Sequence, residues 1–200
     1  MLKKRFVPLL AYTFILFNLG NNIYADENNA YELSKYLKSL NKFKCDFIQA
    51  NPDGSLSEGE MTYYEKKIKI IYQKPTKITF ISKNNKAMYF NEDLMEVEYF
   101  SPDKTALKFF EMIFNLSNLS DESYTLVGRN DLIEITLHNM EIEEISEFKV
   151  IFQNKPIALK KVFWKTEGGG SVFSIFNINK GIVIDKKTFS MVNPLARTLN

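Results

Sequence analysis

Residues 43–72 decide the fold, and their sequence is FKCDFIQANPDGSLSEGEMTYYEKKIKIIY. Apolar and polar side chains alternate along three runs of this stretch, which is typical of β-strands with one buried face. Turn-forming residues interrupt the alternation at Asn51-Pro52-Asp53-Gly54 and again at Glu65-Lys66-Lys67. The stretch therefore predicts three consecutive strands joined by short turns, as in an antiparallel meander.

The same period of two continues through most of the remaining chain. Further strands are expected at residues 78–80, 88–91, 94–100, 124–127, 132–138, 148–152, 158–165, 172–178 and 182–184. About eleven short strands and two or three helices result from this pattern, so the predicted fold class is mainly β (α+β).

Two segments have the period of a helix. Residues 29–41 place Leu33, Leu37 and Leu40 at helical spacing. Ser101-Pro102-Asp103 then offers an N-cap hydroxyl, a proline for the first helical position and an acid for the first turn. The helix expected over 103–115 has a wide apolar face, which is composed of Ala106, Leu107, Phe109, Phe110, Ile113 and Phe114.

The N-terminus has the pattern of an export signal. Lys3, Lys4 and Arg5 precede an apolar run over residues 6–17, and the small residue Ala25 follows a polar stretch. The run is shorter than the roughly 20 residues that a membrane-spanning helix needs. We therefore expect residues 1–25 to be a cleaved signal peptide and residues 26–200 to form one domain.

Composition excludes several classes of function. Removal of the three basic signal residues leaves 23 of the 26 basic residues against 24 acidic ones, a net charge of about −1, and the two signs alternate along the chain. This pattern does not favour nucleic-acid binding. A single Cys and a single His cannot form a disulfide or a Cys/His metal site within one chain. Neither a metal nor another cofactor is expected.

Several short motifs follow one another in the order of a known family. They are Phe43, Phe47 and Gln49 in the first strand, Gly59 in the second, Ile68–Pro75, Lys86–Asn91 with Glu96, Ser101-Pro102, and a closing Phe189–Pro194. In this order and spacing the mature chain resembles the periplasmic outer-membrane lipoprotein carrier protein, the LolA family. Each motif alone is weakly specific.

The resemblance implies a fold, a function and partners. The fold would be a half-open antiparallel β-barrel with helices covering its concave side, and the apolar cavity would hold the acyl chains of lipoproteins. The protein would be a monomer of the periplasm that receives lipoproteins from an inner-membrane releasing transporter and delivers them to an outer-membrane acceptor.

The chain departs from the family pattern at positions that bear on gating. Where the family commonly has Arg, this chain has Glu65-Lys66-Lys67 and Lys69, and the two family Trp positions are Ile70 and Tyr89. A gate that depends on arginine is therefore in doubt. The single Trp of the chain, Trp164, lies in a late strand.

The apolar phases of the strands and of the second helix define the candidate site. The expected cavity residues are Phe47, Met61, Tyr63, Ile70, Tyr72, Ile78 and Phe80, and the expected lid residues on the helix are Leu107, Phe110 and Phe114. Alternating Phe, Ile and Met side chains are more often plain core, so an ordinary packed sheet is the competing interpretation.

Three classes of function remain open at this point. A lipid carrier is favoured by the resemblance. A periplasmic sensor or adaptor of the same fold is the alternative. An enzyme would have to act with carboxylates or tyrosine hydroxyls alone, and no pair of acids at a suitable spacing supports one. We therefore expect a protein without enzymatic activity.

Overall fold

The computed structural model describes residues 27–104, 106–114, 123–129, 131–138 and 145–197. The expected signal segment, residues 1–25, lies outside these ranges. None of the described helices is both long and apolar enough to span a membrane.

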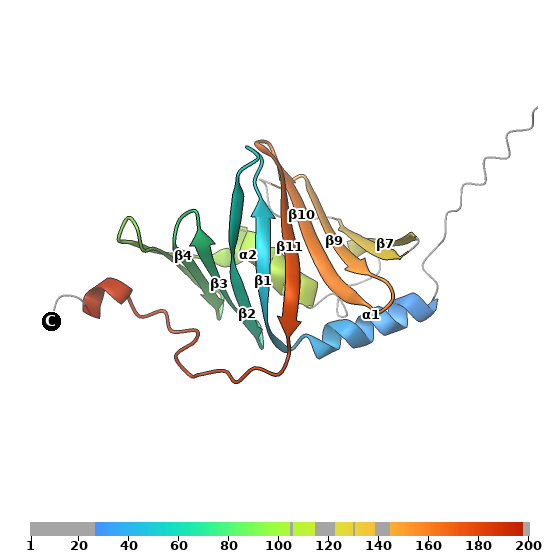
Figure 1. Ribbon diagram of the computed structural model, residues 1–200, viewed down its shortest axis with the longest axis horizontal. Coiled ribbons are helices and arrows are strands. Elements are labelled where there is room, and N and C mark those ends of the chain that lie inside the picture. Colours follow the sequence, from blue (N-terminus) through green and yellow to red (C-terminus); the bar gives the residue numbers. More distant parts are fainter. Residues whose placement is uncertain (1–26, 105, 115–122, 130, 139–144, 198–200) are drawn as a thin grey trace, which may run out of the picture.

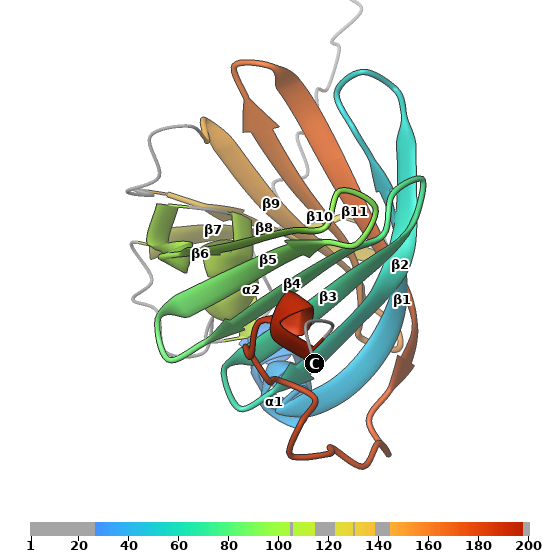
Figure 2. The same ribbon diagram turned by 90° about the vertical axis from the view of Figure 1, so that its left-hand side faces the viewer.

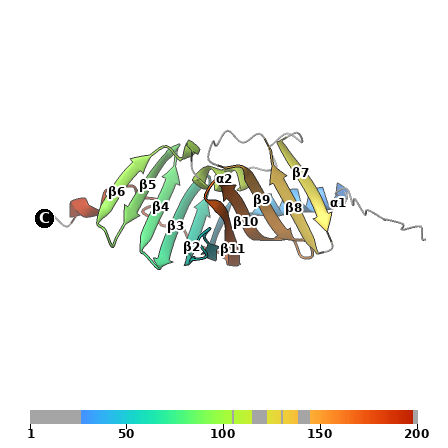
Figure 3. The same cartoon turned by 90° about the horizontal axis from the view of Figure 1, so that it is seen from above.

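Eleven antiparallel strands form one continuous sheet (Figure 1). Their bounds are β1 Lys42–Ala50, β2 Leu56–Tyr64, β3 Lys67–Lys74, β4 Ile78–Lys83, β5 Lys86–Asn91, β6 Glu96–Phe100, β7 Tyr124–Arg129, β8 Leu132–Leu137, β9 Glu147–Gln153, β10 Ala158–Thr166 and β11 Gly169–Asn179. The order across the sheet is β6-β5-β4-β3-β2-β1-β11-β10-β9-β8-β7. Because β6 and β7 are the two edges and do not pair, the sheet is an open, curved barrel (Figure 3). The predicted fold class is confirmed.

One expected strand is wrong. Residues 182–184 are not a strand, and Val183 is 96% exposed. Both edges of β11 are already taken, by β1 on one side and β10 on the other, so no position beside β11 is free for a further hairpin strand. The chain instead leaves the sheet after Asn179 and runs toward the outer side of β4 (Figure 1).

The register places the apolar phases of β1, β2 and β3 on the concave face. Phe47 lies opposite Gly59, and Gly59 lies opposite Tyr72 on the next strand. A side chain at Gly59 would collide with the backbone oxygen of Ile71 and with the ring of Phe47. Glycine at this position therefore lets the Phe47 ring lie across β2.

Two apolar clusters stabilise the sheet. The larger one fills the concave side and includes the buried side chains of β1, β2, β3, β8, β9, β10, β11 and both helices. The smaller one lies on the convex side, where Phe189 of the C-terminal segment packs with Ile81 and Met88. Lys83 donates a hydrogen bond to the Phe189 carbonyl at 2.6 Å, which fixes the segment to β4.

The two α-helices of the described residues cover the concave side. Helix α1 spans Glu27–Ser39 and runs along the lower end of β9, β10 and β11 in Figure 1. A 3-10 helix, Pro102–Lys104, leads into α2, Ala106–Phe114, and Thr105 and Asn115 of the predicted helix lie outside the described residues. Helix α2 lies in the hollow between the β2–β6 wing and the β7–β10 wing (Figures 2 and 3). A last 3-10 helix spans Pro194–Arg197.

Candidate functional site

An apolar cavity lies between α2 and the concave face of the sheet. Its volume is about 290 Å³. The residues that line it come from both wings and from α2, and they are Gln49, Ile70, Tyr72, Phe80, Phe100, Leu107, Phe110, Trp164 and Phe173. Most of these side chains carry no polar atom, so the cavity is suited to an apolar ligand.

Aromatic rings support one another around the cavity. Phe173 stacks on Phe47 with ring centroids 4.2 Å apart, and Phe110 of α2 meets Phe173 edge-on at 5.1 Å. On the other wing Tyr72 and Phe80 are 6.1 Å apart in an edge arrangement. Such offset and edge contacts favour well-defined ring positions, which gives the cavity a fixed wall on the sheet side.

Polar groups gather at one place in this wall. The Tyr72 hydroxyl donates a hydrogen bond to Gln49 Oε1 at 2.6 Å, and Gln49 Nε2 donates to Asn51 Oδ1 at 2.6 Å. Asn51 Nδ2 donates in turn to the hydroxyl of Ser57 at 3.2 Å. Burial raises the pKa of Tyr72 above its ordinary value of 10.0, so its phenol stays neutral and acts as a hydrogen-bond donor.

Helix α2 covers the cavity with its first half and packs on the sheet with its end. Leu107 and Phe110 line the cavity. Phe114, one turn further, packs instead on Tyr63 and Phe43 at centroid distances of 4.2 and 5.3 Å. Both halves of α2 therefore belong to the main apolar cluster, but Leu107 and Phe110 also border the cavity, whereas Phe114 packs directly on the sheet.

Polar contacts at the exposed surface hold the start of α2, whose first half, with Leu107 and Phe110, is called the roof below. Asp103 Oδ2 accepts hydrogen bonds from Asn85 Nδ2 and from the Ser101 hydroxyl, both at 2.9 Å, and Lys108 Nζ lies 3.3 Å from Asp103 Oδ1. The hydrogen bond from Asn85 is the main cause that lowers the pKa of Asp103 below its ordinary value of 3.8. Asn85 belongs to the β4–β5 turn, where it has a left-handed backbone (φ 57) that Asn tolerates well. These four residues are called the Asp103 cluster below.

All seven expected cavity residues share the concave face, but they do not all line the cavity. Ile70, Tyr72 and Phe80 do. The other four comprise Phe47, Met61 and Tyr63, which are buried in the adjoining core, and Ile78, which lies opposite Tyr72 and is partly exposed. Of the lid residues, Leu107 and Phe110 line the cavity and Phe114 packs beside it.

Four lining residues were absent from the expected set. Gln49 continues the phase of Phe47 and was recognised only as part of a motif. Phe173 lies opposite Gln49, and Trp164 lies opposite Ser171, so both reach the cavity through the pairing of β11 with β1 and β10. Phe100 ends the edge strand β6. The alternation marks Gln49 and Phe173 as inward-facing, but it does not indicate which strands become neighbours, and Phe100 shares its phase with Glu96 and Glu98.

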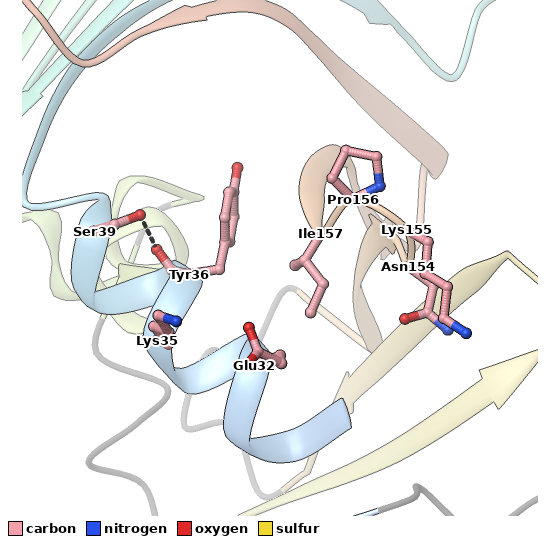
Figure 4. Close-up of a pocket in the computed structure, with 8 residues that line it drawn as sticks. All are labelled: Glu32, Lys35, Tyr36, Ser39, Asn154, Lys155, Pro156 and Ile157. Atoms are coloured by element: carbon pink, nitrogen blue, oxygen red, sulfur yellow. Dashed lines mark hydrogen bonds between the residues drawn. The ribbon is translucent and has the colours of Figure 1, made fainter. Parts of the chain in front are cut away.

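A larger pocket, of about 460 Å³, lies between α1 and the β9–β10 turn (Figure 4). The Tyr36 ring forms one side and Pro156 and Ile157 form the other. Exposed polar side chains, Glu32 and Lys35 among them, line the rest. This surface cannot shield a long apolar chain from water, so the smaller cavity under α2 is the better candidate site.

The described residues offer little for chemistry of another kind. They contain no group of three or more His, Cys, Asp and Glu side chains that could hold a metal ion. Cys45 is buried, and burial raises the pKa of its thiol to about 12, so the nucleophilic thiolate is scarce at neutral pH. His138 and Thr125 contact each other at the protein surface.

The fold defines a class of protein, the half-open antiparallel β-barrel whose concave side is covered by helices. The family model for the outer membrane lipoprotein carrier protein LolA matches residues 38–192. The chain therefore belongs to the LolA family, and the resemblance drawn from its motifs is confirmed. It has the fold of a lipoprotein carrier.

Comparison with solved structures finds MucB. The crystal structure of MucB is 12% identical, with a TM-score of 0.45, and the match covers 83% of this chain and 62% of that chain. MucB in complex with MucA(peri) is 13% identical, with a TM-score of 0.43 and 59% of that chain covered. The complex structure of Pseudomonas aeruginosa MucA/MucB matches at 12% sequence identity and a TM-score of 0.42, and the match covers 60% of that chain. The chain thus spans about three fifths of the length of these proteins. No curated protein matches it.

Proposed function

We propose that this protein is a periplasmic carrier that binds the acyl chains of lipoproteins and takes them from the inner to the outer membrane. The observation that carries the proposal is the apolar cavity under α2, in a chain of the LolA family. An acyl chain gains about 0.8 kcal/mol for each CH₂ group removed from water. A carrier therefore needs an apolar surface that it can offer and withdraw, and it needs no reactive group.

The size of the cavity supports a roof that moves. At about 290 Å³ it lies at the lower end of the roughly 300–1,000 Å³ that ligand pockets have, so it admits only part of a lipid as it stands. The sheet wall is closely packed, whereas Leu107 and Phe110 on the first half of α2 border the cavity. We infer that acyl chains displace Leu107 and Phe110 and take over their contacts with the sheet.

In this proposal the gate is the first half of α2, and the residues that hold it closed do not include an arginine. The Asp103 cluster ties the start of α2 to the β4–β5 turn through exposed contacts, and such contacts contribute little to stability. A weak tie suits a carrier, because ligand affinity depends on the difference between the open and closed states. Loading by an inner-membrane transporter and unloading to an outer-membrane acceptor would each shift this balance.

Release of lipoprotein from membranes tests the carrier role. Mature protein, residues 26–200, is mixed with vesicles that contain an acylated lipoprotein, the vesicles are sedimented, and the soluble fraction is separated by size. We expect a soluble complex of the carrier with the acylated lipoprotein. The same lipoprotein without acyl chains, made by replacing its lipid-attachment Cys with Ser, should not co-elute with the carrier.

Two variants connect the result to the cavity. Phe110→Glu puts a charge on the roof and should abolish the complex. Phe176→Glu is the matched control, because Phe176 lies on β11 and is 41% exposed. Equal co-elution of the unacylated lipoprotein would contradict the proposal. Lipid found in the purified protein without any release of lipoprotein would favour the sensor or adaptor function instead.

A further inference from the structure

The polar groups of the cavity lie toward one end of the sheet. Along the concave face, Ile70 and Phe80 form one row, and Tyr72 lies in the next row toward the β1–β2 turn. Gln49 follows one row further on, opposite Phe173. Trp164 lies opposite Ser171, one row beyond Phe173 in the same direction. The cavity therefore changes from apolar to polar toward the β1–β2 and β10–β11 turns, which lie at the top of Figure 1.

This polar end offers hydrogen-bond donors. Gln49 Nε2 carries two hydrogens and uses one on Asn51, while its carbonyl oxygen already accepts from Tyr72. The indole N–H of Trp164 has no hydrogen-bond partner within the described part of the chain, although the ring lines the cavity. A ligand that reaches this end lies beside the Gln49 amide and the Trp164 indole, and their N–H groups are suited to acceptor atoms.

The absence of a lining cation decides which acceptor fits. Neither Lys, Arg nor His is among the described residues that line the cavity. A carboxylate placed there would lose its hydration without gaining a counter-charge, which is costly. An ester carbonyl is neutral, accepts hydrogen bonds and is attached directly to an acyl chain.

We propose that Gln49 and Trp164 bind the ester carbonyl groups of a glyceryl-linked lipid. The acyl chains would lie toward Ile70 and Phe80, and the glyceryl group would lie toward the β1–β2 and β10–β11 turns. This inference rests on the proposed function, and it adds two residues that hold the ester carbonyl groups and a direction of binding. It predicts selectivity for diacylglyceryl groups over apolar chains that lack a carbonyl.

A pair of lipids that differ only in the carbonyl groups tests the inference. Dioctanoylglycerol has two ester carbonyls, and its diether analogue dioctylglycerol has none. Dissociation constants are measured for both with the mature protein, by the change in Trp164 fluorescence or by competition with a hydrophobic probe. We expect the diester to bind about tenfold tighter, since each net hydrogen bond contributes about 0.5–1.5 kcal/mol.

Variants assign the selectivity to the two residues. Gln49→Leu and Trp164→Phe should each reduce the ratio of the two constants while the diether constant stays within about twofold. Gln73→Leu is the matched control, because Gln73 is exposed on β3. Thermal unfolding checks that each variant is folded. Should Gln49→Leu unfold through loss of its bond to Tyr72, Trp164→Phe still provides the test.

Each contrary result has a distinct meaning. Equal binding of the diester and the diether by the unaltered protein would overturn the ester site and leave the carrier proposal standing. An equal loss of both ligands in Gln49→Leu and Trp164→Phe would mean that the two side chains only shape the cavity, which also overturns the ester site. If the unaltered protein bound neither lipid, the proposed function itself would fail.

Discussion

Helices α1 and α2 cover the same face of the sheet, but they are held in different ways. Under the apolar face of α1, between Leu33, Leu37 and the β7–β8 region, the free space is about 40 Å³, enough for little more than one water molecule, and the pocket of about 460 Å³ beside α1 lies at its polar side. Under α2 the free space is about 290 Å³. The Tyr36 hydroxyl of α1 accepts a hydrogen bond from the backbone N–H of Leu159 at 2.9 Å. The start of α2 is tied to the β4–β5 turn through the exposed Asp103 cluster.

From this difference we expect a different role for each helix. A closely filled apolar contact with a part-buried hydrogen bond is expensive to open, so we expect α1 to be a structural cover. An interface that leaves a cavity has lost part of its packing energy already, so the first half of α2 is the part that ligand can displace most easily. Substitutions in α1 should therefore change stability, and substitutions in the roof of the cavity should change binding.

The largest effect is expected from Phe110→Glu in the roof. Phe110 is 3% exposed, so the new carboxylate would face the cavity and meet acyl chains where an apolar ring now lies. Binding of a fluorescent hydrophobic probe should be abolished while far-UV circular dichroism stays unchanged. Intact probe binding by a folded variant would make α2 an ordinary cover, and global unfolding would make it core like α1.

A large effect of the opposite kind is expected from Leu37→Ala in α1. Leu37 is 4% exposed within the main core, and truncation of a buried Leu costs about 2–5 kcal/mol of unfolding free energy. Urea unfolding measures the loss. Probe affinity, determined under conditions where the variant is folded, should stay at its original value. A variant of normal stability with weakened probe binding would reverse the roles of the two helices.

These tests also separate what the sequence predicts from what it does not. The alternation in residues 43–72 predicts the strands, their inward faces and the turns, because a period of two follows directly from strand geometry. It does not predict that Ile70 lines a cavity whereas Met61, on the same face, is fully buried. That distinction depends on where α2 lies across the sheet.

The cavity residues that the sequence did not predict were missed because they too depend on tertiary arrangement. Trp164 and Phe173 reach the cavity because β11 pairs with β1. This pairing places the last strand of the chain beside the first one, in the middle of the sheet. The strand expected at residues 182–184 fails for that reason too, since β11 has no free edge. Local periodicity carries no information about these long-range pairings. In the family pattern a Trp position falls at Ile70, whereas here Trp164 lines the cavity from the opposite wing.

A moderate effect is expected from Tyr36→Phe. The change keeps the ring and removes the hydroxyl that accepts the Leu159 N–H, and it leaves that buried backbone donor unsatisfied. The expected loss of unfolding free energy is about 1–3 kcal/mol, again without any change in probe affinity. Hydrogen exchange of the Leu159 amide should increase with it. Exchange that is unaffected would indicate that α1 is held by its apolar contacts alone.

The smallest effect is expected from Asp103→Asn at the start of α2. The lowered pKa means that the carboxylate is charged and its cluster intact above the ordinary value of 3.8, and that the cluster is lost as the pH falls through the lower pKa of the folded state. The substitution should therefore raise the rate of probe association at neutral pH, by no more than about fivefold. Stopped-flow fluorescence measures the rate, and a slower rate would contradict a tie that keeps the roof closed.

Quenching of Trp164 fluorescence tests most directly whether acyl chains occupy the cavity under α2. The chain contains one Trp, and it lines this cavity, so the signal reports on a single place. Bromine atoms on an acyl chain quench indole fluorescence on close approach. We predict that a diacylglyceryl lipid with brominated chains quenches Trp164 and that the same lipid without bromine does not, and that Phe110→Glu abolishes the quenching. Brominated lipid that binds tightly, as titration calorimetry would show, and leaves Trp164 fluorescence unchanged would place the acyl chains elsewhere and contradict the account.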